Sequence, residues 1–506
     1  MRKTLVATGV AAAIAGISAL PALANTITGP SSSQSPYLVP TEPGVVVQSL
    51  LTVGDTVPRT GGLPGETYAL VGIPDGLGAF DNGDGTFTLL ANHELRNTQG
   101  AVRAHGAAGS FVSRWIVEKG SLKVRSGTDL IERIYAYGPS GWAQVSGPAL
   151  ALNRLCSADL APISAFYAER DDRRGRDRDD RRLAHRDRGE RDGVGYKGRL
   201  FLNGEENDQG RAFAHALDGT SYDITPWLGS FAWENSVAHP DAGRATVVVG
   251  TDDGTGGQVY VYVGEKQRAG NPVERAGLTN GRLYGVRIVG VPQAESAKAD
   301  WAVGDSFRFE LVDVSGSRAD AATLEAGSNA AGVTSFQRPE DAAWDPDRTD
   351  DLYVATTASF TGNSRLWQLR FDDASNPTRG GTITLKVNGP AATTDGPKMM
   401  DNLTVDDGRV VVQEDPGNQP YLASIWSYGI RSGELRKVAQ HDPNRFDPAV
   451  ASPLLTQDEE SSGIIPLDGV KGGNWFVGTV QAHYALPGEL VEGGQLFAIR
   501  IPKRGR

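Results

Sequence analysis

The chain has 506 residues and a formal net charge of -11 at pH 7. This acidic balance repels a phosphate backbone, so it excludes nucleic acid as an expected partner and favours a protein that binds cations. The 63 glycines and 28 prolines predict many turns and few long helices. Cys156 is the single cysteine, so no disulfide can form within the chain.

The N-terminus has the pattern of a secretory signal. Arg2 and Lys3 precede an apolar run at residues 5–20, and small residues follow as far as Ala24. The pattern predicts a signal peptide at residues 1–24 and export to the periplasm or the extracellular space. The apolar run is too short for a good membrane span and no other segment approaches spanning length, so we expect no membrane span. Residues 25–43 are rich in Ser, Pro and Thr and predict an N-terminal arm.

One pattern recurs six times within residues 44–506: a turn, a short apolar strand and then a polar cluster. The six strands are expected at residues 86–90, 199–202, 245–249, 352–354, 409–412 and 474–477. Many short strands with glycine-rich turns favour an all-β closed architecture. We expect a single domain folded as a six-bladed β-propeller with a metal site in its central channel, because equivalent strands would bring the polar clusters there. The alternative, a pair of large β-sandwiches, would scatter them.

Residues 168–193 interrupt this pattern. They are mostly Arg and Asp, with mixed charge and no apolar periodicity. Such a segment cannot bury a core, so we expect a disordered charged insertion on the surface.

Three of the predicted strands end at neighbouring carboxylates. These pairs are Glu205-Glu206, Asp252-Asp253 and Glu414-Asp415. Adjacent carboxylates repel each other and gain nothing from burial, but their oxygens suit a hard cation such as Ca²⁺. Glu234 lies in a further acidic segment downstream of the first pair, and Asp401-Asn402 supplies further oxygen ligands. The sequence therefore predicts metal ligands at these positions, and the alternative for each pair is an ordinary turn or cap.

Arg338 and Glu340 stand two residues apart. In an extended segment this spacing points both side chains to the same face. A carboxylate that holds a metal, beside an arginine that takes two phosphate oxygens, would make a phosphate site. The alternative is a salt bridge at a strand edge. The sequence lacks the patterns of a serine nucleophile, a zinc-binding helix and a phosphate-binding glycine loop, so a metal-bound oxygen is the nucleophile expected of an enzyme here.

Several motifs occur in the order found in a known family. They are Asn92-His93-Glu94, Cys156, Gly204-Glu205-Glu206, Trp233-Glu234, Gly250-Thr251-Asp252-Asp253, Arg338-Pro339-Glu340, Asp401-Asn402-Leu403, Gln413-Glu414-Asp415 and Gln481-Ala482-His483. From about Val71 to Ile501 the chain resembles, as a divergent member, the PhoX family of exported alkaline phosphatases.

The resemblance implies a six-bladed β-propeller whose central channel holds an iron–calcium cluster. The Cys156 thiolate would bridge two ferric ions (Fe³⁺), and Glu206, Glu234 and Glu340 would be metal ligands. Arg338 would clamp the phosphate during catalysis. A metal-bound thiolate would also explain why an exported protein keeps one cysteine.

The first hypothesis is therefore a calcium-dependent, iron-containing phosphoesterase that acts on small phosphate esters. A metal-bound oxygen would attack the ester, and Arg338, Asn207 and His483 would bind the substrate. A second hypothesis is a calcium-dependent propeller hydrolase of the lactonase or phytase type, in which Cys156 is dispensable. A third is a non-catalytic secreted propeller that binds calcium for stability. We expect a monomer.

Overall fold

The computed structural model describes residues 25–169, 193–390 and 396–503. The predicted signal peptide, residues 1–24, and residues 170–192 of the predicted charged insertion lie outside the described residues. The described ends of the insertion meet, because the short strands β13 (Tyr167–Ala168) and β14 (Val194–Gly195) pair antiparallel. No helix in the described ranges is long and apolar enough to cross a membrane.

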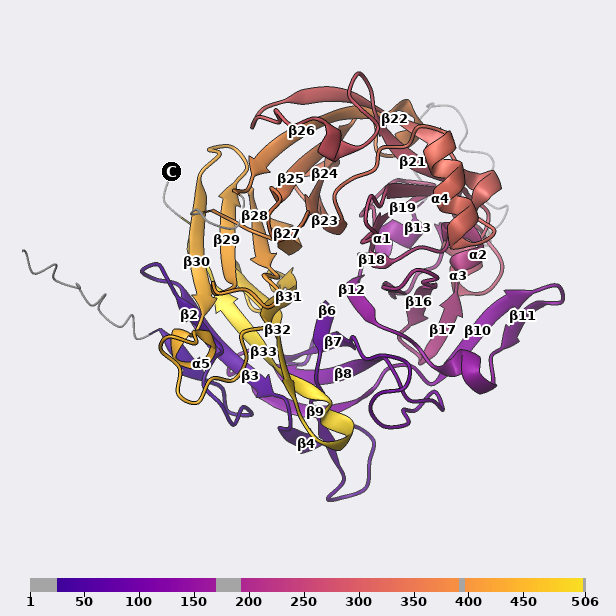
Figure 1. The fold of residues 1–506 in the computed structure, drawn as a ribbon. Helices are drawn as coiled ribbons and strands as arrows, with labels where there is room; N and C mark the ends of the chain where they lie inside the picture. The colour runs from indigo at the N-terminus through magenta and orange to yellow at the C-terminus, as the bar shows by residue number, and fades with distance from the viewer. Residues whose placement is uncertain (1–24, 170–192, 391–395, 504–506) are drawn as a thin grey trace, which may run out of the picture.

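The described chain is mostly β, as predicted, and its large sheets surround a common centre (Figure 1). From the centre outward, the first sheet contains β6 (Pro74–Asp81), β7 (Thr86–His93), β8 (Phe111–Glu118) and β9 (Val124–Asp129). The second contains β12 (Leu155–Asp159), β15 (Leu200–Glu205), β16 (Ala212–Ala216), β17 (Thr220–Asp223), β10 (Arg133–Gly138) and β11 (Gly141–Gln144).

A nine-stranded sheet follows in the chain and reaches the centre at both ends. Its order is β18 (Trp233–Ala238), β19 (Ala245–Asp252), β20 (Val259–Glu265), β21 (Arg282–Ile288), β22 (Ser306–Asp313), β26 (Gly381–Asn388), β25 (Arg365–Phe371), β24 (Arg348–Thr356) and β23 (Pro339–Asp345). The next sheet contains β27 (Met400–Asp406), β28 (Arg409–Glu414), β29 (Ser424–Gly429), β30 (Leu435–His441) and β2 (Leu38–Pro40). The last large sheet contains β31 (Glu459–Pro466), β32 (Trp475–Ala485), β33 (Glu492–Arg500), β3 (Val46–Thr52) and β1 (Thr26–Thr28).

The remaining elements are short. Strands β4 (Thr56–Pro58) and β5 (Thr67–Ala69) form a small pair. The α-helices are α1 (Ile163–Phe166), α2 (Thr225–Leu228), α3 (Pro272–Arg275), α4 (Ala321–Ala330) and α5 (Pro443–Phe446). The longest, α4, is capped at its N-terminus by the side chain of Asp320, which accepts a hydrogen bond from the Thr323 amide.

Six inner strands contact one another in a closed ring: β6, β12, β18, β23, β27 and β31, with β31 returning to β6. The two ends of the chain close this ring, because β3 pairs antiparallel with β33 and β2 pairs with β30. Residues 25–43, predicted as an arm, therefore supply β1 and β2 to sheets that the C-terminal part of the chain also builds.

Each of the six strands expected to begin a recurring unit overlaps a strand of the structure, and each is the second strand from the centre. These second strands are β7, β15, β19, β24, β28 and β32. The turn before β28 shows how the sequence starts such a strand. Asp407 and Gly408 both have positive φ (50° and 77°), as a two-residue hairpin turn of type I′ requires, and they join Asp406 to its partner Arg409.

Candidate metal centre

Each inner strand places its second residue at the same end of the ring. These residues are Asp75, Cys156, Glu234, Glu340, Asp401 and Glu460. With Glu94, Glu206 and Asp415 they form four groups of three, and within each group the candidate ligand atoms lie within 4.8 Å of one another. Neighbouring groups share Cys156, Glu234 or Asp401, so the four groups form one continuous arc of candidate ligands, which we call the acidic arc.

A repeated irregularity of the sheets turns these side chains toward the centre. In five of the six cases this residue lies within a register shift between the inner strand and the second strand. Side chains in a regular strand alternate between its two faces, and a bulge changes the direction of the residue next to it. The sixth pair, β31 with β32, has its shift further along, between Ser462 and Ile464.

The backbone just before the inner strands repeats as well. Ile73, Arg154, Arg338 and Met399 each stand two positions before a residue of this inner set, and their φ angles lie between 47° and 58°. Non-glycine residues rarely adopt this left-handed conformation, which is found most often at functional sites. Their carbonyl oxygens accept hydrogen bonds from the amides of Glu94, Glu206, Thr357 and Asp415, respectively. These bonds fix the ends of the second strands against the starts of the inner ones.

The second strands contribute the residues that directly follow them. Glu94, Glu206, Asp253 and Asp415 occupy this position after β7, β15, β19 and β28. Glu94, Glu206 and Asp415 are members of the acidic arc, and Asp253 binds Arg338 beside it. The predicted carboxylate pairs therefore each send their second member toward the centre.

The first members of these pairs, Glu205, Asp252 and Glu414, lie outside the acidic arc. Glu205 accepts hydrogen bonds from the Arg211 side chain (2.7 Å) and from the Asn153 amide (2.9 Å). Glu414 accepts one from Nε1 of Trp426 at 2.9 Å. Burial, with a smaller contribution from the charge of Glu325, raises the pKa of Asp252 to about 7. Strand alternation is the reason: adjacent residues point to opposite faces, so a pair cannot send both side chains to one centre.

The acidic arc holds more carboxylates than the neighbouring cationic side chains can neutralise. Five carboxyl groups of the arc have pKa values well above their usual range, because they are buried and lie next to other carboxylates. They are Asp75, Glu206, Glu234, Glu340 and Asp401. Burial, and then the charge of Asp75, likewise raises the pKa of the Cys156 thiol, whose Sγ donates a hydrogen bond to Oδ2 of Asp75 at 3.3 Å. Oδ1 of Asp75 and Oε1 of Glu234 are buried without a hydrogen-bond partner among the described residues. Bound cations would remove the repulsion and use these free oxygens, so this donor set fits metal ions.

Two arginines border the acidic arc, and they differ in which guanidinium nitrogens are hydrogen-bonded to the protein. Arg154 uses Nε on Glu94 (2.7 Å), and Nη1 and Nη2 on the backbone and side chain of Glu206 (3.1 and 2.5 Å). Arg338 donates from Nε and Nη2 to the two carboxylate oxygens of Asp253 at 2.7 and 2.8 Å, and its Nη2 lies 3.3 Å from Glu340. Nη1 of Arg338 has no hydrogen-bond partner among the described residues, and 34% of the side chain is exposed. Arg338 therefore has a donor available for a ligand.

His483 lies at the Glu460 end of the acidic arc. Its Nδ1 is 2.6 Å from Glu492 and its Nε2 is 3.7 Å from Glu460. Burial alone would lower its pKa, but the bonds and charges of Glu460 and Glu492 outweigh burial and raise it to about 11. The ring is therefore a cation at neutral pH. Asn207, also predicted to bind substrate, follows Glu206 in a loop where its Oδ1 accepts a hydrogen bond from the Gln209 amide at 3.2 Å.

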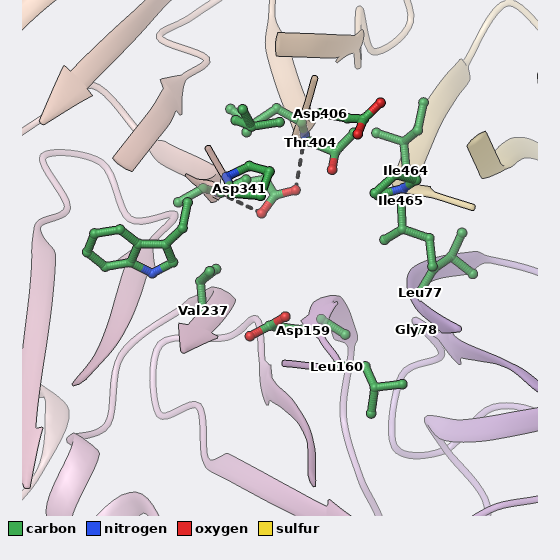
Figure 2. Close-up of a pocket in the computed structure, with 18 of the residues that line it drawn as sticks. Leu77, Gly78, Asp159, Leu160, Val237, Asp341, Thr404, Asp406, Ile464 and Ile465 are labelled. Carbon is green, nitrogen blue, oxygen red and sulfur yellow. Dashed lines mark hydrogen bonds between the residues drawn. The ribbon is translucent and has the colours of Figure 1, made fainter. Parts of the chain in front are cut away.

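A hydrogen-bonded layer closes one side of the acidic arc. It consists of the residues that follow four of the inner set, namely Ser157, Asn235, Asp341 and Asn402. Below this layer, toward the other ends of the inner strands, lies a cavity of about 690 Å³ with walls that include Leu77, Val237 and Ile464. Figure 2 shows Asp159 and Asp341 on opposite sides of this cavity.

Residues 220–461 match the family model described as alkaline phosphatase PhoX. Over these residues, just under half of its length, the chain matches the PhoX family. Pseudomonas fluorescens PhoX, solved in complex with vanadate, a transition state analogue, resembles it with a TM-score of 0.60 and 14% sequence identity, over 94% of this chain and 97% of that chain. Identity this low shows a shared fold, so the mostly β ring described above is the fold of a PhoX protein.

Other solved structures are less similar. A mutant Trypanosoma rangeli sialidase displaying trans-sialidase activity has a TM-score of 0.38 and 9% identity, over 91% of this chain and 59% of that chain. Chaetomium thermophilum Sqt1 bound to the N-terminus of the ribosomal protein L10 has a TM-score of 0.34 and 8% identity, over 84% and 96%. A search of curated protein sequences finds no significant match.

The residues that the PhoX resemblance predicts as metal ligands lie together in the acidic arc, and further residues belong to the same arc. Cys156, Glu206, Glu234 and Glu340 are in the acidic arc, with Arg338 beside it. Asp401, expected as an oxygen ligand, also lies in the acidic arc, whereas no role was predicted for Asp75, Glu94, Arg154 or Glu460. The sequence does contain a signal for three residues of the arc, Asp75, Asp401 and Glu460. Each is an acidic residue followed by a small or polar one, as in Glu234-Asn235 and Glu340-Asp341.

Proposed function

We propose that this protein is a member of the PhoX family and an exported, metal-dependent phosphoric ester hydrolase of the alkaline phosphatase type. One observation carries the proposal: a buried arc of carboxylates and one thiol, in need of cations, lies beside an arginine whose Nη1 is free. We also propose that the six inner strands belong to six blades of one β-propeller domain at residues 44–506, which the closed ring of strand contacts supports.

The composition of the four groups supports two kinds of metal ion. Cys156 belongs both to the group with Asp75 and Glu94 and to the group with Glu206 and Glu234, so its sulfur fits a bridge between two iron ions. The remaining two groups, Glu234-Glu340-Asp401 and Asp401-Asp415-Glu460, contain only carboxylates, the ligands that Ca²⁺ prefers. When bound, such ions supply positive charge that neutralises the phosphate and lowers the pKa of water.

The protein's own residues would hold and orient the ester. Nη1 of Arg338 would donate to a non-bridging phosphate oxygen, while Asp253 keeps the guanidinium plane in place through two hydrogen bonds. The charge of His483 adds to the positive potential at the Glu460 end. Hydrolysis breaks the P–O bond to the alcohol, forms a P–O bond to the oxygen of water and releases the alcohol and inorganic phosphate.

The test combines elemental analysis of protein purified from its native host with hydrolysis of an aryl phosphate, with and without a chelator. We expect iron and calcium in the protein, chelator-sensitive turnover, and loss of turnover in Cys156→Ala. Calcium alone, with turnover that survives in Cys156→Ala, would favour the lactonase- or phytase-type hydrolase. Bound metal without hydrolysis of any ester would refute the enzyme proposal and leave a calcium-stabilised binding protein.

A further inference from the structure

A cavity of about 460 Å³ opens directly beside Arg338. Its lining includes Phe336, Gln337, Arg338, Ala358, Phe360 and Met399. Cavities of this size commonly hold small organic ligands. Its wall contains no residue of the acidic arc, so it is a separate compartment that meets the candidate metal centre at one side chain, Arg338.

The walls of this cavity are chemically unlike the acidic arc. Arg338 is the one charged residue among the residues that line it. Phe336 and Met399 form a buried apolar part, and Phe360 contributes an aromatic ring to the wall while the residue remains 48% exposed. Four hydroxyl groups and the Gln337 amide provide uncharged hydrogen-bonding groups around them. A ligand with an apolar or aromatic body and no further charge fits such a wall, because a second anionic group would find no cation to pair with.

The cavity is built from fixed backbone. The Phe336 amide donates to the carbonyl of Gly257 at 2.8 Å, and the Gln337 amide donates to buried Glu295 at 2.9 Å. Glu295 is in turn ion-paired with Arg365. Three lining residues, Arg338, Ala358 and Met399, have φ angles of 58°, 66° and 47°, so two of the left-handed residues beside the acidic arc, Arg338 and Met399, also shape this wall.

Phe360 is held in place at the edge of the cavity by close packing on Gly417. A Cβ atom on Gly417 would come within 2.9 Å of Cε1 of Phe360, so the aromatic ring lies directly on the glycine. Gly417 also donates its amide to Oδ1 of Asp415, a member of the acidic arc, at 2.9 Å. The ring of Phe360 is therefore positioned relative to the candidate metal centre through a short, hydrogen-bonded segment.

We propose that this cavity is the leaving-group site, and that the preferred substrates are phosphate monoesters of uncharged alcohols with an aromatic or apolar body. The inference rests on the proposed function: with the phosphoryl group on Nη1 of Arg338, the alcohol of the ester extends into the cavity and contacts Phe360. Esters whose alcohol carries another phosphate or carboxylate are poor substrates, and very small alcohols gain nothing from the cavity.

The test compares benzyl phosphate with methyl phosphate, whose leaving alcohols have similar acidity, so that a difference reports binding rather than intrinsic reactivity. We expect a higher kcat/KM for benzyl phosphate, and Phe360→Ala lowers that value about tenfold, mainly through KM, as loss of a hydrophobic contact to a substrate does. Hydrolysis of methyl phosphate changes less than twofold. Phe360→Leu keeps most of the preference. Tyr137→Ala serves as the matched control, because Tyr137 is also 48% exposed but lies on β10, away from the cavity.

Benzylphosphonate and methylphosphonate, which cannot be hydrolysed, separate this inference from the proposed function. If neither ester is hydrolysed but benzylphosphonate binds more tightly and Phe360→Ala removes the difference, the cavity assignment stands and the enzyme proposal fails. If both esters are hydrolysed with no preference, or if Phe360→Ala lowers both equally, the enzyme proposal stands and the leaving-group site is refuted. Absence of both hydrolysis and phosphonate binding refutes both.

Discussion

Replacing Glu234 by glutamine should have opposite effects on stability with and without bound metal. Glu234 belongs to two groups of the acidic arc, and within each group the ligand atoms lie within 4.8 Å of one another. At that separation two unit charges repel by about 3.5 kcal/mol at an effective dielectric constant of about 20. Proton uptake relieves part of this repulsion, since burial and the charges of Glu340 and Glu206 already raise the pKa of Glu234. We therefore expect Glu234→Gln to stabilise the metal-free protein by about 1–2 kcal/mol.

With metal bound, the same substitution removes a ligand. A hundredfold loss of affinity lowers the stability gained from saturating metal by about 2.7 kcal/mol. Urea unfolding of wild type and variant, each in excess chelator and in excess Ca²⁺ and iron, measures both effects. The order of stability should reverse between the two conditions.

Glu205→Gln is the matched control. Glu205 is as buried as Glu234, but it is bound to Arg211 and lies outside the acidic arc. Its replacement breaks a buried ion pair, so it should destabilise the protein equally with and without metal. The reasoning is refuted if Glu234→Gln destabilises the protein by the same amount in both conditions, or if chelation leaves the stability of the wild type unchanged.

Three further outcomes are expected. Arg338→Ala should lower kcat/KM for phosphate esters about 10²–10³-fold, as loss of a charged donor at a reacting phosphate does. Arg338→Lys should recover only part of this activity, because lysine cannot keep two hydrogen bonds to Asp253 and a third to the ester. Steady-state kinetics that show full activity in Arg338→Ala would exclude the assigned role. Arg154→Ala should reduce the metal content more than it changes KM, since the Arg154 side chain is fully engaged with Glu94 and Glu206. Elemental analysis checks this. An unchanged metal content with a raised KM would instead show that Arg154 binds the substrate. Burial raises the pKa of Asp159 from 3.8 to about 7, so the folded state retains a proton that the unfolded state loses, and stability falls as pH rises between these values. Asp159→Asn should therefore stabilise the protein at pH 8 by about 1 kcal/mol, reduced for its contact with a water-accessible cavity, and by less at pH 5; thermal unfolding that shows the same gain at both pH values would contradict this.

The architecture could be predicted because its signals are local. Runs of β-branched residues such as Val247–Val249, preceded by turns that contain glycine, identify strands wherever they occur. These signals located the second strands but not the inner strands, whose sequences are more polar. The inner strands are recognised only once pairing is known, because their burial comes from the neighbouring sheets of the ring.

The site could be predicted only in part because side-chain direction depends on register. The sequence marks Glu205-Glu206 as acidic but does not say which of the two faces the centre. That choice depends on the shift between Leu155 and Ala158 in the pairing of β12 with β15, which is a property of two strands far apart in the chain. Glu460 was missed for a related reason: it resembles a surface residue in sequence, and it is partly covered by strands that reach it only when the ring closes.

Closure of the ring also sets when the candidate metal centre can form. The seam lies between β31 and β6, and the sheet at this seam joins β3, near the start of the chain, to β33, near its end. Gln481, on β32, bridges the seam with hydrogen bonds from Nε2 to Asp75 (2.9 Å) and Glu94 (3.0 Å). A growing chain therefore cannot complete the centre until its last strands have been synthesised. Metal capture becomes a late event, and a chain that ends before β32 is left with the carboxylates of the early sheets but no enclosed centre to hold the ions.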